Sequence, residues 1–310
     1  MHRRFFTNTA ILLILTLILT GCGIAGGKAS AEKTGKSGQA DQTRFNIVTS
    51  FYPVYIATIN VTKGIEGVVV TNMTKPQTGC LHDYSLRPDD LKMLERADAF
   101  VINGAGMESF LDDVIKQREN LRIITAAADI PLIKDRDGVD NPHVWVSITN
   151  EIKCVENIAD QLSAVDPAHS AQYIANKNAY TNKLKSLKDE LHKELDGLKN
   201  KDIITFHEAF PYFAQEFGLN IAAVVEREPG SEPSPKELGG IIDAVEKTGS
   251  RALFAEPQYS SKAADAIARE TGAKVYSLDP GVTGDSAPDV FNAYLETMWQ
   301  NGRTLKEALE

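Results

Sequence analysis

The sequence predicts an α/β protein of two similar lobes joined by one long, rigid helix. Short apolar runs rich in β-branched residues alternate with helical patterns from Phe45 onward, which is typical of parallel βαβ units. The same alternation starts again at about residue 200, and a helical pattern of about 30 residues separates the two series. We therefore expect a ligand cleft between the lobes, at the carboxyl ends of the strands.

The first lobe is expected over residues 45–163. One of its helices should begin at Pro88, because proline and the two aspartates after it suit the positive end of a helix dipole. The strands of this lobe are predicted at residues 47–51, 68–72, 99–103 and 121–125, and its helices at residues 87–97, 107–117 and 147–162.

The connecting helix is expected within residues 164–199, because the pattern over 167–196 has proline only at its start and Gly197 just past its end. The second lobe is expected over residues 200–310. Its strands are predicted at residues 202–206, 221–225, 252–255 and 274–278, and its helices at residues 212–217, 235–248, 261–271 and 288–309.

The charge and the cysteine content restrict the possible partners and sites. The chain has 33 basic and 42 acidic residues, a net charge of −9, which disfavours nucleic acid as a partner. Its three cysteines are too few for a disulfide scaffold and form no CxxC motif. A metal site should therefore depend mainly on histidine and carboxylate side chains.

Residues 1–21 are predicted to be a lipoprotein signal peptide. Two arginines precede an apolar run over residues 11–19 that is too short to span a bilayer comfortably. The residues Leu-Thr-Gly-Cys at 19–22 resemble the bacterial lipobox, which implies cleavage before Cys22 and acylation of that cysteine, with palmitate as an expected acyl chain. We therefore expect a protein anchored by lipid to the extracytoplasmic face of the cell membrane, with residues 22–44 as lipidated cysteine and flexible linker.

Three of the six histidines are candidate metal ligands. His82 lies in a loop after the second predicted strand, His143 lies at the end of the first lobe, and His207 ends a strand of the second lobe. Such loops face the expected cleft, and three imidazoles suit a borderline-soft divalent metal ion. Asp279 ends the last strand in the same way and would complete a four-coordinate shell. The other three histidines are expected in the signal peptide or in solvated helical segments: His2, His169 and His192.

Seven sequence blocks carry a family resemblance. They are residues 81–91 (LHDYSLRPDDL), 103–108 (NGAGME), 142–145 (PHVW), 205–210 (TFHEAF), 232–235 (EPSP), 256–259 (EPQY) and 271–280 (TGAKVYSLDP). In these blocks the chain resembles the metal-binding solute receptors of bacterial ABC importers, which take up zinc or manganese. The resemblance implies a monomeric, non-enzymatic receptor with metal ligands at His82, His143, His207 and Asp279. It also implies a membrane permease and an ATPase as partners.

Position 207 separates the branches of this family, because manganese receptors usually have glutamate there and zinc receptors histidine. His207 therefore implies Zn²⁺ as the captured ion, and neutral imidazole suits zinc whereas hard oxygen ligands suit manganese. Two features depart from the zinc pattern. The segment before Pro142 lacks the histidine-rich loop of Gram-negative zinc receptors, and Leu81 stands where relatives often have proline. A manganese or iron receptor of the same importer class is the alternative.

Three further residues could act near the metal. Cys80 could be a thiolate ligand, a packed small residue or the disulfide partner of Cys154, and it is left out of the expected ligand set. Glu256 and Glu208 could orient a ligand imidazole, or they could cap a helix or face solvent.

Two other functions compete with a receptor. A zinc metallohydrolase would need an open coordination position for water and a nearby general base, whereas a His₃Asp shell is closed. A surface adhesin is the third possibility, and no residue of the sequence supports or excludes it.

Overall fold

The computed structural model describes residues 44–81, 84–116, 120–135, 138–225, 234–285, 287 and 290–310. Residues Gln42–Glu310 form one compact unit. The predicted signal peptide, Cys22, most of the linker and His82 lie outside the described residues. In the part of the chain that is described, no helix combines the length and the apolar character needed to cross a bilayer.

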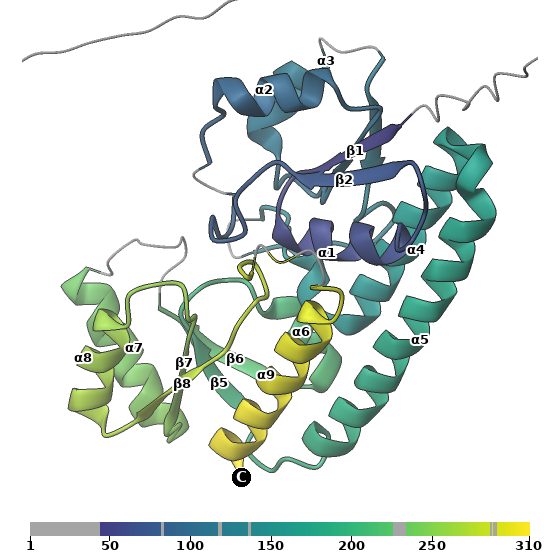
Figure 1. Ribbon diagram of the computed structural model, residues 1–310. Helices are drawn as coiled ribbons and strands as arrows, with labels where there is room; N and C mark the ends of the chain where they lie inside the picture. The colour runs from purple at the N-terminus through teal and green to yellow at the C-terminus, as the bar shows by residue number, and fades with distance from the viewer. Residues whose placement is uncertain are drawn as a thin grey trace, which may run out of the picture. The chain divides into compact units, whose positions relative to one another are not determined.

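The first lobe contains a parallel sheet of four strands in the order β2-β1-β3-β4 (Figure 1). The chain leaves β1 for β2 on one side and then crosses to β3 on the other, so the strand order reverses between β1 and β3. All four predicted strands are confirmed to within about two residues at each end. The strands are β1 (Phe45–Thr49), β2 (Val68–Asn72), β3 (Ala99–Ile102) and β4 (Arg122–Thr125).

Helices cover both faces of this sheet. Successive residues of a strand point to opposite faces, so Ile47 packs into a core with α1 (Tyr52–Val61), whereas Val48 packs against α2 (Pro88–Glu95) and the 3-10 helix η1 (Ser109–Leu111). The short helix α3 (Asp112–Lys116) follows η1 directly, so the helix expected over 107–117 forms as these two pieces.

Four helical segments lead from the first lobe to the second: η2 (Val144–Val146), α4 (Ile148–Val165), η3 (Pro167–His169) and α5 (Ser170–Leu195). The helix α5 has 26 residues, which corresponds to about 39 Å. Figure 1 shows it running along the side of both lobes, with the last helix, α9 (Ala293–Leu309), beside it. The expected long connecting helix is therefore present.

The second lobe repeats the topology of the first, with a parallel sheet in the order β6-β5-β7-β8. The predicted fold class is thus confirmed. The helix α9 begins at Ala293 rather than at residue 288, and residues 288–289 are not described. The strands are β5 (Asp202–Thr205), β6 (Asn220–Val224), β7 (Ala252–Ala255) and β8 (Lys274–Ser277). The helices before α9 are α6 (Pro211–Phe217), α7 (Pro235–Thr248) and α8 (Lys262–Thr271).

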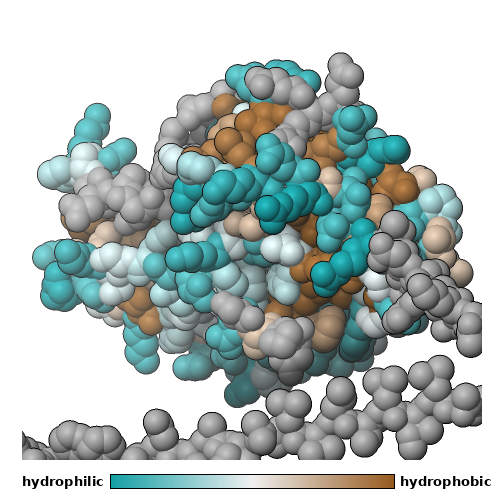
Figure 2. All heavy atoms as spheres, turned by 45° about the horizontal axis from the view of Figure 1, so that its top comes forward, coloured by the Kyte–Doolittle hydropathy of each residue, from teal (hydrophilic) through white to brown (hydrophobic). Residues whose placement is uncertain are grey.

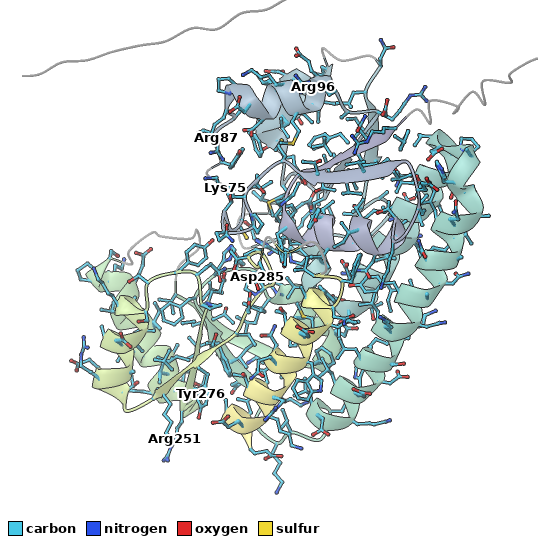
Figure 3. The ribbon with its side chains drawn as sticks, in the orientation of Figure 1. Lys75, Arg87, Arg96, Arg251, Tyr276 and Asp285 are labelled. Carbon is cyan, nitrogen blue, oxygen red and sulfur yellow. The ribbon has the colours of Figure 1, made fainter. Side chains whose placement is uncertain are left out.

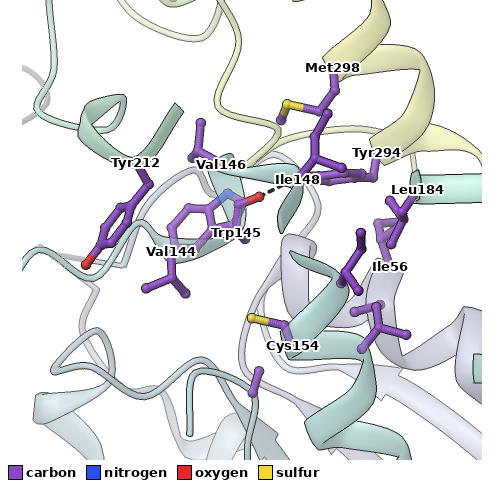
Figure 4. Packing of buried hydrophobic residues seen from close by; sticks show 14 of the residues in the cluster. Ile56, Val144, Trp145, Val146, Ile148, Cys154, Leu184, Tyr212, Tyr294 and Met298 are labelled. Atoms are coloured by element: carbon purple, nitrogen blue, oxygen red, sulfur yellow. Dashed lines mark hydrogen bonds between the residues drawn. The ribbon is translucent and has the colours of Figure 1, made fainter. Parts of the chain in front are cut away.

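One hydrophobic core is shared by both lobes and the connecting helices. In the second sheet Ile203 and Phe254 face this core, whereas Ile204 and Leu253 face a smaller core with α7 and α8. Trp145 lies at the centre of the shared core (Figure 4). Its indole nitrogen donates to the carbonyl of Pro280 at 2.8 Å, and its own carbonyl accepts from the Tyr294 hydroxyl at 2.8 Å.

The surface contrasts with this core. Figure 2 shows one face on which hydrophilic residues predominate, with hydrophobic residues visible in patches between them. Exposed large hydrophobic side chains among the described residues are Leu91, Val139 and Trp299.

Candidate metal centre

Three side chains from different loops bring donor atoms together at the carboxyl ends of the strands. Cys80 follows β2, His143 precedes η2, and His207 follows β5. One possible ligand atom from each of them lies within 4.8 Å of the others. The rings of His143 and His207 meet edge to face, with centroids 4.7 Å apart and an interplanar angle of 86°. Both histidines are buried.

The amide of Asn141 determines which nitrogen of His143 faces the centre. Asn141 Oδ1 accepts from the backbone nitrogen of His143 at 3.0 Å, and it lies 2.9 Å from His143 Nδ1. A backbone N–H can only donate, so the atom it meets is the oxygen of the amide, and Nδ1 must carry a proton to donate to it. The other nitrogen, Nε2, is therefore left with its lone pair, which is the form that binds a metal ion.

Asn141 is itself held by the second lobe. Its Nδ2 donates to the carbonyl of Glu208 at 2.7 Å, and its carbonyl accepts from the Tyr212 hydroxyl at 2.7 Å. In addition, Asn103 Nδ2 donates to the carbonyl of Pro142 at 2.9 Å. The loop that carries His143 is thus fixed on both sides. Sequence reasoning missed Asn141, although its place two residues before a candidate ligand was a usable signal.

Glu256 plays the equivalent part for His207. His207 Nδ1 lies 2.9 Å from Glu256 Oε1, and Gln258 Nε2 donates to the other carboxylate oxygen at 2.6 Å. Since a carboxylate accepts, Nδ1 carries the proton and Nε2 again presents a lone pair. His207 follows β5 and Glu256 follows β7, so they meet where the strand order reverses, the usual position of a ligand site in such sheets.

The first lobe has a buried carboxylate at its own reversal point. Glu108 accepts hydrogen bonds from Ser50 Oγ at 2.7 Å, from the Asn103 nitrogen at 2.8 Å and from the Gly104 nitrogen at 3.0 Å. Burial raises the pKa of Glu108 to about 7, although these three donors favour the ionised form. This network orders the backbone around Asn103, which in turn holds the loop of His143.

The loop that carries Cys80 is hydrogen-bonded to the second lobe. Gln77 Nε2 donates to the carbonyl of Gly284 at 3.0 Å, and the Gly284 nitrogen donates to the carbonyl of Pro76 at 3.1 Å. The Tyr259 hydroxyl forms a hydrogen bond with the backbone of Cys80. Figure 3 labels Lys75 and Asp285, which belong to these two segments, where the lobes meet.

Asp279 is held in place by the last helix and by its own loop. Its backbone nitrogen donates to Asn301 Oδ1 at 2.9 Å, its carbonyl accepts from Asn301 Nδ2 at 2.6 Å, and its Oδ1 accepts from the Gly281 nitrogen at 2.7 Å. Burial raises the pKa of Asp279, and the negative charge of Glu256 raises it further. Among the described residues, the close donor group contains Cys80 and not Asp279.

The other predicted site residues have different places. His82 and Cys22 lie outside the described residues. Glu208 is half-buried, and its carbonyl accepts the hydrogen bond of Asn141. Cys80 and Cys154 are not joined in a disulfide, and Cys154 is buried in α4. His169 and His192 pair with the nearby Asp166 and Asp196, far along the chain from the centre.

A pocket of about 370 Å³ leads to the two described histidines. His143 and His207 lie in its wall together with the acidic residues Asp135, Asp140 and Glu208. Carboxylates around a low-dielectric opening raise the local concentration of cations. The pocket wall thus combines metal-binding donors with three acidic residues, one of which, Asp140, is paired with Lys134 at 2.7 Å.

The sequence family agrees with this geometry. The model of the family described as zinc-uptake complex component A, periplasmic (ZnuA), matches residues 47–308. The chain belongs to this family. The resemblance seen in the sequence is therefore confirmed.

Individual members of the family and solved structures show the same relationship. The zinc-binding protein AdcA of Streptococcus pyogenes serotype M1 is 31% identical over 296 residues, which cover 85% of this chain and 56% of that protein. The chain thus spans about half the length of the AdcA relatives that it matches. The manganese-binding lipoprotein MntA of Halalkalibacterium halodurans is 26% identical over 316 residues, which cover 96% of this chain and 97% of the relative.

A solved structure of the laminin binding protein Lmb of Streptococcus agalactiae is also similar. It is described as a bifunctional protein with adhesin and metal transporting activity. The TM-score is 0.78 at 28% sequence identity, and the similarity covers 86% of this chain and 100% of that chain. The present chain and that protein therefore share one fold.

Proposed function

We propose that this protein is an extracytoplasmic receptor that captures Zn²⁺ and delivers it to the permease and ATPase of an ABC importer. The observation that carries the proposal is the pair of buried imidazoles, His143 and His207, whose Nδ1 atoms are both engaged by acceptors. Their Nε2 lone pairs are thereby oriented before any ion arrives. Such a preorganised pair suits a divalent ion of intermediate softness.

The proposed ligand set is His82, His143, His207 and Asp279, with Glu256 orienting His207. Four protein ligands close a tetrahedral zinc site and leave no position for a catalytic water. We therefore propose binding and delivery, not hydrolysis, as the function of the site. Family membership supports this proposal.

Zinc is favoured over manganese by the donor types in the centre. Imidazole nitrogen is softer than the oxygen ligands that Mn²⁺ prefers, and two imidazoles lie in the close donor group. The relative AdcA is named as zinc-binding and the relative MntA as manganese-binding. Mn²⁺ is therefore the alternative ion for this receptor.

Zinc-dependent stability tests the receptor function. Four ligands from two lobes are assembled only in the folded state, so Zn²⁺ at about a hundred times its dissociation constant should add about 2.7 kcal/mol to the free energy of unfolding. Urea unfolding with and without Zn²⁺ measures this effect. The proposal fails if millimolar Zn²⁺ leaves the unfolding midpoint unchanged and the purified protein contains no metal by mass spectrometry.

The proposed anchor is lipid on Cys22, which would keep the receptor on the outer face of the membrane beside its permease. The name of the relative MntA includes the word lipoprotein, which supports this placement. Cys22→Ala should release the protein from the membrane fraction in a host with a lipoprotein pathway and remove the acyl mass. Retention of the variant with an unchanged acyl mass would refute the anchor.

A further inference from the structure

We propose that the sulfur of Cys80 is a ligand of the captured ion, and that it makes the site selective for thiophilic metals. This inference rests on the proposed metal-receptor function. It goes beyond that function because it gives the thiolate of Cys80 the ligand position that the family resemblance assigns to Asp279, a carboxylate that lies outside the close donor group. The structure gives it three lines of support.

The first is distance. Cys80 Sγ lies 3.7 Å from His143 Nε2, the nitrogen that Asn141 leaves with its lone pair. In a tetrahedral zinc site with a Zn–S bond of about 2.3 Å and a Zn–N bond of about 2.05 Å, the sulfur and the nitrogen lie about 3.6 Å apart. The distance between the sulfur and the ring nitrogen therefore already matches the distance between two ligand atoms of a tetrahedral zinc ion.

The second is convergence. Cys80 Sγ, one nitrogen of His143 and one nitrogen of His207 lie within 4.8 Å of one another, and each comes from a different loop. A single ion placed between the three atoms would contact both lobes. The described residues form this one group of three or more candidate ligands, and Cys80 is a member of it.

The third is the rigidity of the loop that carries the sulfur. Gly79 has a φ of +83°, which favours glycine, and a Cβ atom there would lie 3.1 Å from the Tyr259 hydroxyl. Tyr259 bonds the backbone of Cys80, and the next side chain, Leu81, is fully buried. Cys80 is thus fixed between two anchors, as a ligand must be if binding is not to cost loop ordering.

The binding step is balanced without a redox partner. A metal ion displaces the thiol proton, a sulfur–metal bond forms, and the proton passes to water. Thiolate prefers Zn²⁺, Cd²⁺ and Cu⁺ to Mn²⁺. Cys80 would therefore disfavour manganese, in addition to the effect of His207.

Cobalt substitution tests the proposal on the full-length protein purified in detergent. Co²⁺ bound to thiolate gives a near-ultraviolet sulfur-to-metal charge-transfer band, in addition to the visible bands of a tetrahedral cobalt site. We expect both sets of bands in the wild type and in the control Cys154→Ala. In Cys80→Ser the visible bands should persist and the charge-transfer band should disappear.

Metal competition provides the second measurement. Cys80→Ser should weaken Cd²⁺ and Zn²⁺ binding by roughly tenfold or more and should change Mn²⁺ binding by about twofold or less. An equal loss for all three metals, or no loss at all, would overturn the assignment.

The spectrum of the wild type also separates the two proposals, and it does not depend on whether any variant folds. Visible cobalt bands without a charge-transfer band would overturn the role of Cys80 and leave the receptor function standing. If the wild type bound no cobalt, zinc or cadmium, the receptor function itself would be refuted, and the present inference with it.

Discussion

His207 Nδ1 and Glu256 Oε1 lie 2.9 Å apart, and both side chains are almost completely buried. The two residues are 49 positions apart in the sequence, yet adjacent strands bring them to the same edge of the second sheet. The carboxylate holds the proton on Nδ1 and orients the ring. A residue that never touches the ion therefore controls one of its ligands.

Glu256→Gln should weaken zinc binding by roughly 10- to 100-fold, because the amide is a weaker acceptor for His207 and can present its NH₂ group to the ring. Competition titration with a zinc chromophore measures the change. The exposed Glu246 offers a matched control, and Glu246→Gln should leave zinc affinity unchanged. Equal affinities of Glu256→Gln and the wild type would exclude a role in orienting the ligand.

His207→Glu should shift the preference from Zn²⁺ toward Mn²⁺, because it replaces an imidazole with a hard carboxylate. The new carboxylate would lie beside Glu256, so the double variant His207→Glu/Glu256→Gln should show the shift with less loss of total affinity. Parallel titrations with Zn²⁺ and Mn²⁺ give the ratio.

Controls for this prediction come from the other histidines. His143→Ala should weaken zinc binding strongly, whereas His169→Ala and His192→Ala should have no effect. An unchanged zinc-to-manganese ratio in His207→Glu would disprove the proposed ligand set, as would an equal loss of affinity in His192→Ala and His143→Ala.

Glu151 should make the stability of the protein depend on pH. Its side chain is buried in α4, its Oε1 has no hydrogen-bond partner among the described residues, and burial raises its pKa well above the usual value. A raised pKa in the folded state means that its contribution is complete below about pH 4.5 and is lost as the pH rises through the folded pKa. In Glu151→Gln the amide does not titrate, so this loss of stability does not occur.

The measurement is the free energy of unfolding by urea at about pH 4.5 and about pH 7.5. At each pH, the free energy of unfolding of the wild type is subtracted from that of Glu151→Gln. This difference should be larger at the higher pH by on the order of 1–3 kcal/mol. The difference between the two pH values is the test, since the cost of burying the amide is the same at both. A difference near zero would show that the pKa of Glu151 is not raised in the folded protein.

Glu216→Ala should loosen the contact between the lobes. The Glu216 carboxylate, on α6, accepts from the backbone nitrogens of Ile148 and Thr149 at 2.7 and 3.0 Å and from the Thr149 hydroxyl at 2.5 Å. It caps the positive end of α4 from the second lobe. The variant should lose about 1–2 kcal/mol of stability in urea unfolding. The control is the exposed neighbouring residue, and Gln215→Ala should leave the stability unchanged. Equal stability of the two variants would contradict the cap.

Elements with clear local signals could be predicted from the sequence. The helix α7 has the predicted bounds because Ser234 and Glu237 bond each other's backbone nitrogens at its start and Gly249 ends it with a φ of 63°. The helix α1 could not be predicted. Nine of its ten residues are buried, so it has no polar face and its β-branched residues resemble a strand.

The site was only partly accessible to the same reasoning. The strand ends indicated that His143 and His207 converge, and the structure brings them together. The sequence left the role of Cys80 open, because its nearness to His143 depends on a loop that is fastened to the other lobe. No local sequence pattern can predict a contact between residues that are 63 positions apart.

The shared core around Trp145 has a consequence for how the chain folds. Side chains from the first sheet, from α5 and from the second sheet belong to one continuous cluster, so neither lobe encloses its own apolar surface completely. A fragment ending near residue 199 would expose the partners of Tyr294 and Met298 to water. We therefore expect the two lobes to unfold together in one transition, and to assemble only after the C-terminal helix has been synthesised.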